Sequence, residues 1–456
     1  MNASMVKLIA IGVVVIVAAA GVTVFLVTRD DGKSSVSIDA ALEVYGNADN
    51  DYKIDANDKD VIQKVIDGDE GYNLEKYPLA DANYDGEVNQ ADLDVVDKII
   101  NGESTTVYHI NYITNTEQSR YNPYVADTKW PIAKCIGNGT ANALVCYMMV
   151  GLQDKISAIN YSAGSPPDAT LYPAFHEMPS LGTSSMYLTA SLVTAAVAAD
   201  TSITAVITAD NKSYLSSTAS GRIDEAGLED IGLDVIRIRH AAVDAKDFGS
   251  ALLLLGFLFQ KESNAYDAIE WIQNAYGKLN DKIKDVTPLK ALAASGDNGV
   301  SGTNSDYSDV VKGAGAVLPW NQYDKSSYAL ADIPWVYDED KQPDKIVMIR
   351  TGGSYGSWYV PDGMDLKKFD DTCLTGQFSA FRAYTENNIY LISGDMPIVA
   401  RVMYAAVALY PDLVSEDFAD EIHQDFVDTF LGSSYNVSEL QFIHTSQEIK
   451  AAGAVA

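Results

Sequence analysis

The chain has 456 residues, a formal net charge of −31 and a pI near 4.3. This length suffices for two or three domains, and the acidity argues against nucleic-acid binding, which requires a basic surface. The three cysteines, Cys135, Cys146 and Cys373, give no disulfide framework and allow at most one intrachain bridge.

Residues 8–27 form an uncharged run of 20 residues, LIAIGVVVIVAAAGVTVFLV, which is long enough to cross a bilayer as a helix. The apolar core of a cleaved signal peptide is usually shorter, although the alanines at 18–20 would permit cleavage. We therefore expect residues 1–29 to be an uncleaved, single-pass anchor in the cell membrane. A polar spacer at 30–37 follows, and the bulk of the chain is expected to be extracellular.

Residues 81–92 carry oxygen side chains at loop positions 1, 3, 5, 9 and 12, and residues 47–58 repeat the pattern. Alternate residues of a turning loop can direct their oxygens at one hard cation, so two calcium sites are predicted. The candidate ligands are Asn47, Asp49, Asp51, Lys53, Asp55 and Asp58 in the first loop, and Asp81, Asn83, Asp85, Glu87, Asn89 and Asp92 in the second.

The two loops differ at positions 1 and 6. Asn47 replaces the acid at position 1 of the first loop, and Tyr52 stands where the second loop has Gly86. We expect Tyr52 to take a strained left-handed conformation, and the second site to bind calcium more tightly. Residues 38–103 contain 18 acidic and 5 basic residues, so without cations this segment would repel itself strongly.

Each loop leads into one short amphipathic helix, which is expected to stop at Gly68 or Gly102. No regular amphipathic helix precedes either loop. This duplicated unit, over residues 38–103, resembles the dockerin module. The resemblance implies two bound calcium ions and docking to a cohesin domain.

From residue 104 the composition becomes mixed and rich in aromatic residues, which marks the start of a large domain. Short β-like runs alternate with helical ones, a pattern typical of α/β folds with largely parallel sheets. An unbroken helical pattern is predicted from about 244 to 286. It separates a first lobe at about 106–243 from a second at about 287–456. The strands are expected at 107–113, 156–160, 203–208, 235–238, 346–349 and 388–392, and further helices at 142–150, 399–409 and 418–431.

Four stretches of this domain carry a family resemblance. They are LEDIGLDVIRI at 228–238, the long helix at 248–284, QPDKIVMI at 342–349 and AFRAYTENNIYLI at 380–392. In this order they resemble the class III solute-binding proteins of ABC transporters, whose two lobes are joined by a helical backbone. The resemblance implies a receptor for a ferric siderophore, cobalamin or related metal complex that works with a membrane permease. One position departs from the pattern, because Thr189 or a neighbour stands where many members have a glutamate that docks onto the permease.

In open α/β sheets, ligands bind beyond the carboxyl ends of the strands. The loop at 350–359 is the best candidate, because it combines glycines with an arginine and three aromatic side chains. Such a loop suits a large, partly anionic, conjugated ligand. The alternative is that these aromatic residues only pack over the sheet edges. The candidate ligand-binding residues are Asn138, Tyr161, Tyr187, Trp320, Arg350, Tyr355, Trp358 and Tyr359.

No catalytic motif stands out in the sequence. The five histidines do not pair at metal-ligand spacing, which disfavours a zinc site, and a G-x-S-x-G nucleophile elbow is absent. The sequence therefore predicts a cell-surface receptor for a metal complex, with calcium as a structural ion, and no enzyme. The alternatives are a dockerin-bearing surface scaffold or adhesion protein with a degenerate binding domain, and, ranked lowest, an extracellular hydrolase.

Overall fold

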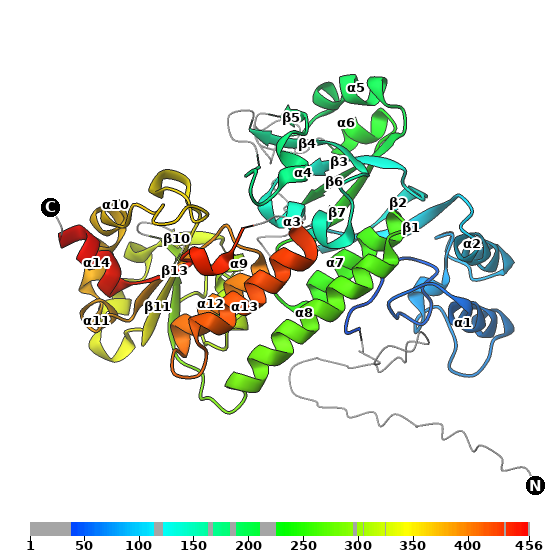
Figure 1. Ribbon diagram of the computed structural model, residues 1–456. Coiled ribbons are helices and arrows are strands. Elements are labelled where there is room, and N and C mark those ends of the chain that lie inside the picture. The colour runs from blue at the N-terminus through cyan, green and yellow to red at the C-terminus, as the bar shows by residue number, and fades with distance from the viewer. Residues whose placement is uncertain are drawn as a thin grey trace, which may run out of the picture.

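A computed structural model of the protein describes residues 38–113, 122–162, 167–182, 188–209, 225–294, 299–303, 305–323, 325–432 and 435–454. These residues form a small N-terminal module (38–104) and two α/β lobes, with two packed helices between the lobes (Figure 1). The anchor expected at 1–29 and the spacer at 30–37 lie outside the described residues. Among the helices that are described, none combines the length and the apolar character needed to span a membrane.

The N-terminal module consists of two loop–helix units. Its helices are α1 (Ala56–Asp67) and α2 (Gln90–Ile100), with the 3-10 turn η1 (Pro78–Ala80) between them. Both helices begin with a capping box, in which Asp55 or Asn89 caps the first turn and an aspartate three residues later bonds back. Ile62, Leu93 and Val96 then form a small apolar core between the helices.

Lobe 1 contains a five-stranded parallel sheet in the order β5-β4-β3-β6-β7. The strand predicted at 107–113 exists, but it pairs antiparallel with β2 in a separate two-stranded ribbon. The elements are β1 (Thr105–Ile113), β2 (Asn122–Trp130), β3 (Lys134–Asn138), α3 (Ala141–Val150), β4 (Ile156–Ser162), α4 (Pro173–His176), β5 (Ser180–Gly182), α5 (Ala190–Ala199), β6 (Ile203–Ala209), α6 (Glu225–Asp230) and β7 (Asp234–Ile238).

Lobe 2 contains a six-stranded mixed sheet in the order β10-β9-β8-β11-β12-β13, whose central strands β8, β11 and β12 are parallel. Its strands are β8 (Ala291–Ala294), β9 (Gly299–Ser301), β10 (Ser327–Ala329), β11 (Lys345–Arg350), β12 (Ile389–Ser393) and β13 (Ile443–Thr445). Its α-helices are α9 (Asp306–Gly313), α10 (Leu366–Phe369), α11 (Arg382–Thr385), α12 (Ile398–Leu409), α13 (Glu416–Phe426) and α14 (Ser446–Ala454). Its short 3-10 and π turns are η3 (Leu330–Asp332), η4 (Pro334–Tyr337), η5 (Glu339–Lys341), η6 (Gly353–Tyr355), η7 (Asp370–Leu374), η8 (Gln377–Ala380), η9 (Val427–Leu431) and η10 (Val437–Glu439).

The prediction of a single long helix over 244–286 is wrong. This segment forms two helices, α7 (Ala245–Leu258) and α8 (Glu262–Ile283). Gln260 takes a left-handed conformation with φ of 54°, and the Lys261 backbone N–H then bonds the Gly256 carbonyl at 2.7 Å. The chain therefore turns back on itself. A Cβ at Gly256 would lie 2.7 Å from the Ala265 Cβ, so only glycine permits this close packing of the two helices. Figure 1 shows α8 lying beside α7 and running on toward lobe 2.

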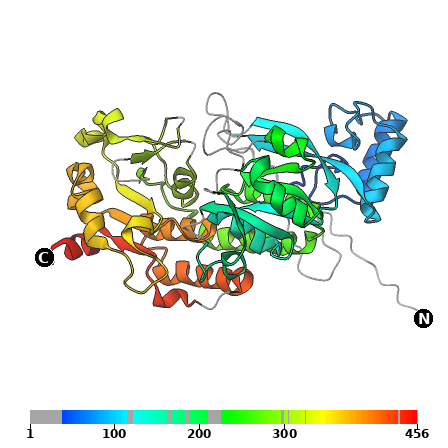
Figure 2. The same cartoon turned by 90° about the horizontal axis from the view of Figure 1, so that it is seen from above.

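The N-terminal module packs firmly against the α7–α8 hairpin and lobe 1. Tyr52 is 7% exposed and meets Tyr266 of α8 edge to face, with ring centroids 5.1 Å apart. Val44 pairs with His109 of β1 as an isolated antiparallel bridge. Arg239, which follows β7, reaches back to Glu43 at 2.9 Å. The three parts lie in a row, with lobe 1 in the middle (Figure 2).

The two lobes are also joined by a buried arginine. Arg401 of α12 is 3% exposed, and its Nη2 donates to Asn142 Oδ1 of α3, in lobe 1, at 2.9 Å. Its Nη1 lies 3.2 Å from Asp306 Oδ2, within lobe 2. Its Nε donates to the Met396 carbonyl at 2.7 Å. This guanidinium therefore has partners on three sides and fixes one interlobe contact.

Replacing Tyr52 by alanine is expected to lower the free energy of unfolding by about 2–4 kcal/mol, because a buried aromatic ring at the module–hairpin contact is lost. Urea denaturation of the full chain measures this change. The control Tyr72→Ala removes a ring that stacks on Tyr77 within the module, and it should cost less than about 1 kcal/mol. Equal losses for the two variants would contradict the packing role given to Tyr52.

Arg401→Met is expected to cost about 3–5 kcal/mol, because it leaves Asp306 without its buried cation. The matched control is Lys284→Met, which removes an exposed ion pair with Asp281, spaced 3.2 Å apart. That pair should contribute less than about 1 kcal/mol. Thermal and urea unfolding of both variants would compare them, and a loss for Arg401→Met no larger than for the control would refute the structural role of Arg401.

Candidate functional site

A cavity of about 400 Å³ lies between the two lobes, within the size range of ligand pockets. We call it the interlobe cavity. Its walls come from the segments that follow β3 and β4 in lobe 1 and β11 and β12 in lobe 2. These segments lie at the carboxyl ends of parallel strands, where ligands of α/β folds bind. The described residues that line it are Gly139, Ala141, Leu144, Pro167, Asp168, Leu171, Tyr172, Gly352, Gly353, Gly356, Ser357, Tyr359 and Asp395.

The lobe 1 wall begins where β3 ends. Asn138 is buried, and its Oδ1 accepts the Thr140 backbone N–H at 2.8 Å, which turns the chain into α3. Asp168 Oδ1 accepts the backbone N–H groups of Thr170 and Leu171 at 2.8 and 3.1 Å. These bonds hold the exposed Asp168 at the rim, while the buried Tyr172 lines the cavity beside it.

The lobe 2 wall is a glycine-rich loop folded onto the end of β12. Gly352 N–H donates to Asp395 Oδ2 at 2.7 Å, and the Tyr359 hydroxyl donates to the Asp395 carbonyl at 3.0 Å. Trp358 Nε1 donates to the Arg350 carbonyl at 3.0 Å, which ties the loop to the last residue of β11. Tyr359 and Asp395 are thus held together on one side of the cavity.

The charged side chains among the described lining residues are both acidic, Asp168 from lobe 1 and Asp395 from lobe 2. Burial raises the pKa of Asp395, and the nearby Asp168 carboxylate raises it further. The bond from the Gly352 N–H and the positive charge of Arg401 act in the opposite direction on this pKa. The cavity is therefore an acidic, partly desolvated space.

The structure brings only part of the predicted ligand-binding set to this cavity. Tyr359 lines it, and Asn138 shapes its wall from beneath. Trp358, Trp320 and Tyr355 are buried in lobe 2, because their rings help to fill its aromatic core.

Two other predicted residues already have partners outside the cavity wall. The Tyr161 hydroxyl donates to the Met178 carbonyl at 3.0 Å, and the Arg350 guanidinium lies 5.0 Å from the centroid of the Tyr355 ring. Tyr187 lies outside the described residues. Asp168, Tyr172 and Asp395 were not predicted, although Asp395 follows a predicted strand at the position that the strand-end rule selects.

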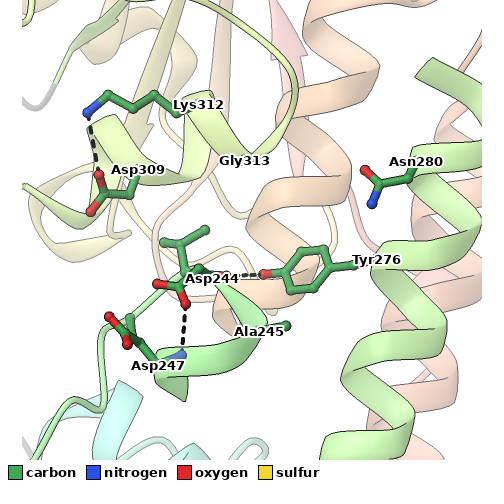
Figure 3. Close-up of a pocket in the computed structure, with 10 residues that line it drawn as sticks. Asp244, Ala245, Asp247, Tyr276, Asn280, Asp309, Lys312 and Gly313 are labelled. Atoms are coloured by element: carbon green, nitrogen blue, oxygen red, sulfur yellow. Dashed lines mark hydrogen bonds and ion pairs between the residues drawn. The ribbon is translucent and has the colours of Figure 1, made fainter. Parts of the chain in front are cut away.

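A larger cavity, of about 530 Å³, lies among the start of α7, the middle of α8 and the end of α9 (Figure 3). Its polar groups are engaged in fixing the crossover between the lobes. Asp244 accepts the Asp247 N–H at 2.7 Å, and the Tyr276 hydroxyl donates to the Val243 carbonyl at 2.7 Å. Lobe 2 contributes helix α9 here rather than strand-end loops, so we assign the ligand site to the interlobe cavity.

The first loop of the N-terminal module corrects one expectation from the sequence. Tyr52 does not have a positive φ, because the left-handed residue is Asn50 at position 4, with φ of 57°. Tyr84, at position 4 of the second loop, has φ of 55°, and Gly86 at position 6 has φ of 91°. The first loop therefore shares the bend at position 4 and lacks the one at position 6, and Tyr52 packs against Tyr266.

The two loops close in the same way at position 12. Asp58 and Asp92 are fully buried, and each accepts the backbone N–H of position 3, at 3.2 Å from Asp49 and 3.1 Å from Asn83. The carboxylate of Asp81, at position 1, accepts the N–H groups of Asp85 and Gly86. The carboxylates of Asp81 and Asp92 thus accept backbone N–H groups of the second loop.

Position 1 of the first loop is different. The Asn47 side-chain nitrogen donates to the carbonyls of Leu42 and Asp51, and its buried Oδ1 has no hydrogen-bond partner. The oxygen-rich donors of the second loop fit calcium chemistry, whereas Asn47 offers the first loop one neutral oxygen. In the described ranges, no group of three or more His, Cys, Asp or Glu side chains is arranged to hold a metal ion.

The histidines and cysteines have structural surroundings. His109 bonds to the Thr128 hydroxyl and His423 to the Tyr435 hydroxyl, both inside the core. All three cysteines are described, and each is a buried thiol outside any disulfide. Burial raises the pKa of the Cys135 and Cys146 thiols, as expected for inert core cysteines.

The comparisons with known proteins concern the fold. No protein-family model matches the sequence, and no curated protein matches it either. A solved structure of the TroA-like periplasmic binding protein FepB from Veillonella parvula is similar, with a TM-score of 0.51 and 16% identity, over 74% of this chain and 99% of that chain.

Two further solved structures have TM-scores below 0.5. A periplasmic solute-binding protein from Veillonella parvula has a TM-score of 0.49 at 18% identity, over 73% of this chain and 95% of that chain. The molybdate-binding protein MolA from Haemophilus influenzae has a TM-score of 0.48 at 15% identity, over 71% and 99%. The similarity to the FepB structure indicates that the two lobes have the bilobal α/β fold of class III periplasmic solute-binding proteins.

Proposed function

We propose that the protein is a cell-surface solute-binding receptor, which captures an iron chelate, a corrinoid or a related metal complex for import by an ABC permease. The observation that carries the proposal is the interlobe cavity, which is walled by strand-end loops of both lobes. A bilobal solute-binding fold uses such a cavity for binding without chemistry.

The cavity wall suits a ligand with both apolar and polar surface. Tyr172 from lobe 1 and Tyr359 from lobe 2 offer ring surfaces, and the backbone around Gly352 and Gly353 allows close approach. Asp168 and Asp395 add two polar groups that fix orientation. A few polar groups in a mainly apolar and aromatic pocket are typical of small-molecule sites.

The N-terminal module would hold two calcium ions, one in each loop, with the second loop binding more tightly. Asp58 and Asp92 support this, because buried carboxylates in an oxygen-rich loop are stabilised by a bound cation. The same module would present a docking surface to a cohesin-like protein. Residues 8–27 would hold the chain in the cell membrane, with the lobes outside.

Titration of the full chain with ferric chelates and with corrinoids is expected to give a saturable change in tryptophan fluorescence. Tyr359→Ala should weaken binding by about 10-fold or more, because it removes a ring and a hydroxyl from the cavity wall. The control Tyr323→Ala removes an exposed ring outside this cavity and should leave affinity unchanged. Absence of binding across both ligand sets would rule out the ligand class.

Calorimetric titration with calcium is expected to resolve two unequal sites. Asp81→Ala should weaken the tighter site by about 10-fold or more, because calcium affinity depends on the number of charged ligands. Asn47→Ala should change the weaker site alone, and Asp94→Ala on the exposed face of α2 should change neither. Two equal sites, or an Asp81→Ala variant that binds as the natural chain does, would contradict the assignment.

A further inference from the structure

The charge of the interlobe cavity determines which metal complexes it can hold. Asp168 and Asp395 are the charged side chains among its described lining residues, and they come from opposite lobes. The Asp395 carboxylate is the more buried of the two, and its Oδ2 is held by the Gly352 N–H at 2.7 Å. Any ligand between the lobes therefore meets a carboxylate on each side.

The two arginines near the cavity, Arg401 and Arg350, have partners outside the cavity wall. Arg401 lies behind the wall, where its guanidinium bonds Asp306, Asn142 and the Met396 carbonyl. The Arg350 guanidinium lies over the Tyr355 ring, although the sequence suggested that this residue would favour a partly anionic ligand. Neither arginine is among the residues that line the cavity.

Enclosing a ligand in this cavity would remove water from two like charges. Two carboxylates that lose water while facing the same small space repel each other, and each loses hydration that only a donor or a cation can replace. An anionic ligand would add a third negative charge to the same space. A positive group placed between the two carboxylates would instead satisfy both and hold the lobes together.

Resting on the receptor function above, we propose that the interlobe cavity takes a ligand that places a positive charge between Asp168 and Asp395. A metal complex with a pendant ammonium group is the ligand class that fits. The same geometry discriminates against anionic chelates and oxyanions.

The test compares two ferric complexes that differ by one charge. A linear ferric trihydroxamate with a free terminal ammonium group is titrated calorimetrically into the full chain, beside the same complex acetylated at that nitrogen. A trianionic ferric tris-catecholate and a metal-free linear polyamine complete the set. The ammonium complex is expected to bind about 10- to 100-fold more tightly than the acetylated one, because a charge-assisted hydrogen bond is lost on acetylation.

Variants separate the effect of the carboxylates from that of folding. Asp168→Asn and Asp395→Asn should each weaken binding of the ammonium complex by about 10-fold and should weaken binding of the acetylated complex much less. Asparagine at 395 keeps an oxygen for the Gly352 N–H. Glu421→Gln, on the exposed face of α13, is the matched control and should change neither affinity.

The outcomes distinguish this inference from the proposed function. Equal or tighter binding of the acetylated complex or the tris-catecholate would overturn the charge preference while supporting the receptor. Binding of the polyamine alone, lost in both aspartate variants, would support the charge preference and overturn the metal-complex ligand. Absence of binding by all four probes would overturn both.

Discussion

The packing of α8 against every other part of the molecule is the interaction on which the remaining structure depends. Tyr266 near its start meets Tyr52 of the N-terminal module, and the Asn264 amide donates to the Val150 carbonyl of lobe 1 at 3.0 Å. One and a half turns further on, Trp271 donates to Asp425 of lobe 2 at 2.7 Å and packs against Phe426. A helix of 22 residues, about 33 Å long, thus connects all three parts.

The interlobe cavity follows from this arrangement. With α8 fixing the separation of the lobes and Arg401 joining them on one side, the strand-end loops face each other across a gap of defined size. The loop at 352–359 folds onto Asp395 and lines the lobe 2 side of the cavity. The size and the charge of the site therefore have different origins. The helices determine the size of the cavity, and two aspartates make its charge negative.

Part of the regular structure of both lobes could be predicted from the sequence, because the apolar runs of these elements are bounded by turn residues. The predicted elements that the structure contains are β1, β4, β6, β7, β11, β12, α3, α12 and α13. The break at Gln260 could not be predicted, since glutamine is no turn signal and the apolar repeat continues from α7 into α8. The alternation of strand and helix patterns also suggested that the strand at 107–113 belongs to the parallel sheet. It pairs instead with β2, which was not predicted.

For the candidate site, the strand-end rule pointed to the loop at 350–359, part of which lines the interlobe cavity, whereas composition favoured Trp358 and Tyr355, which the structure buries in lobe 2. Trp358 and Tyr355 are large aromatic residues, and the same apolar area that suggested stacking on a ligand favours their burial in the core of lobe 2. Asp395 was hard to distinguish in a chain with 63 acidic residues. Tyr52 was likewise interpreted within its loop, whereas its packing partner is more than 200 residues away in the sequence.

The shared core of the N-terminal module and lobe 1 has a mechanical consequence. Because Glu43 and Val44 of the module contact Arg239 and His109 of lobe 1, and Tyr52 packs against Tyr266 of the hairpin, the module is attached to that lobe. A partner protein that binds the module would therefore also immobilise lobe 1. The direction in which the interlobe cavity opens would then be set by whatever the module is attached to.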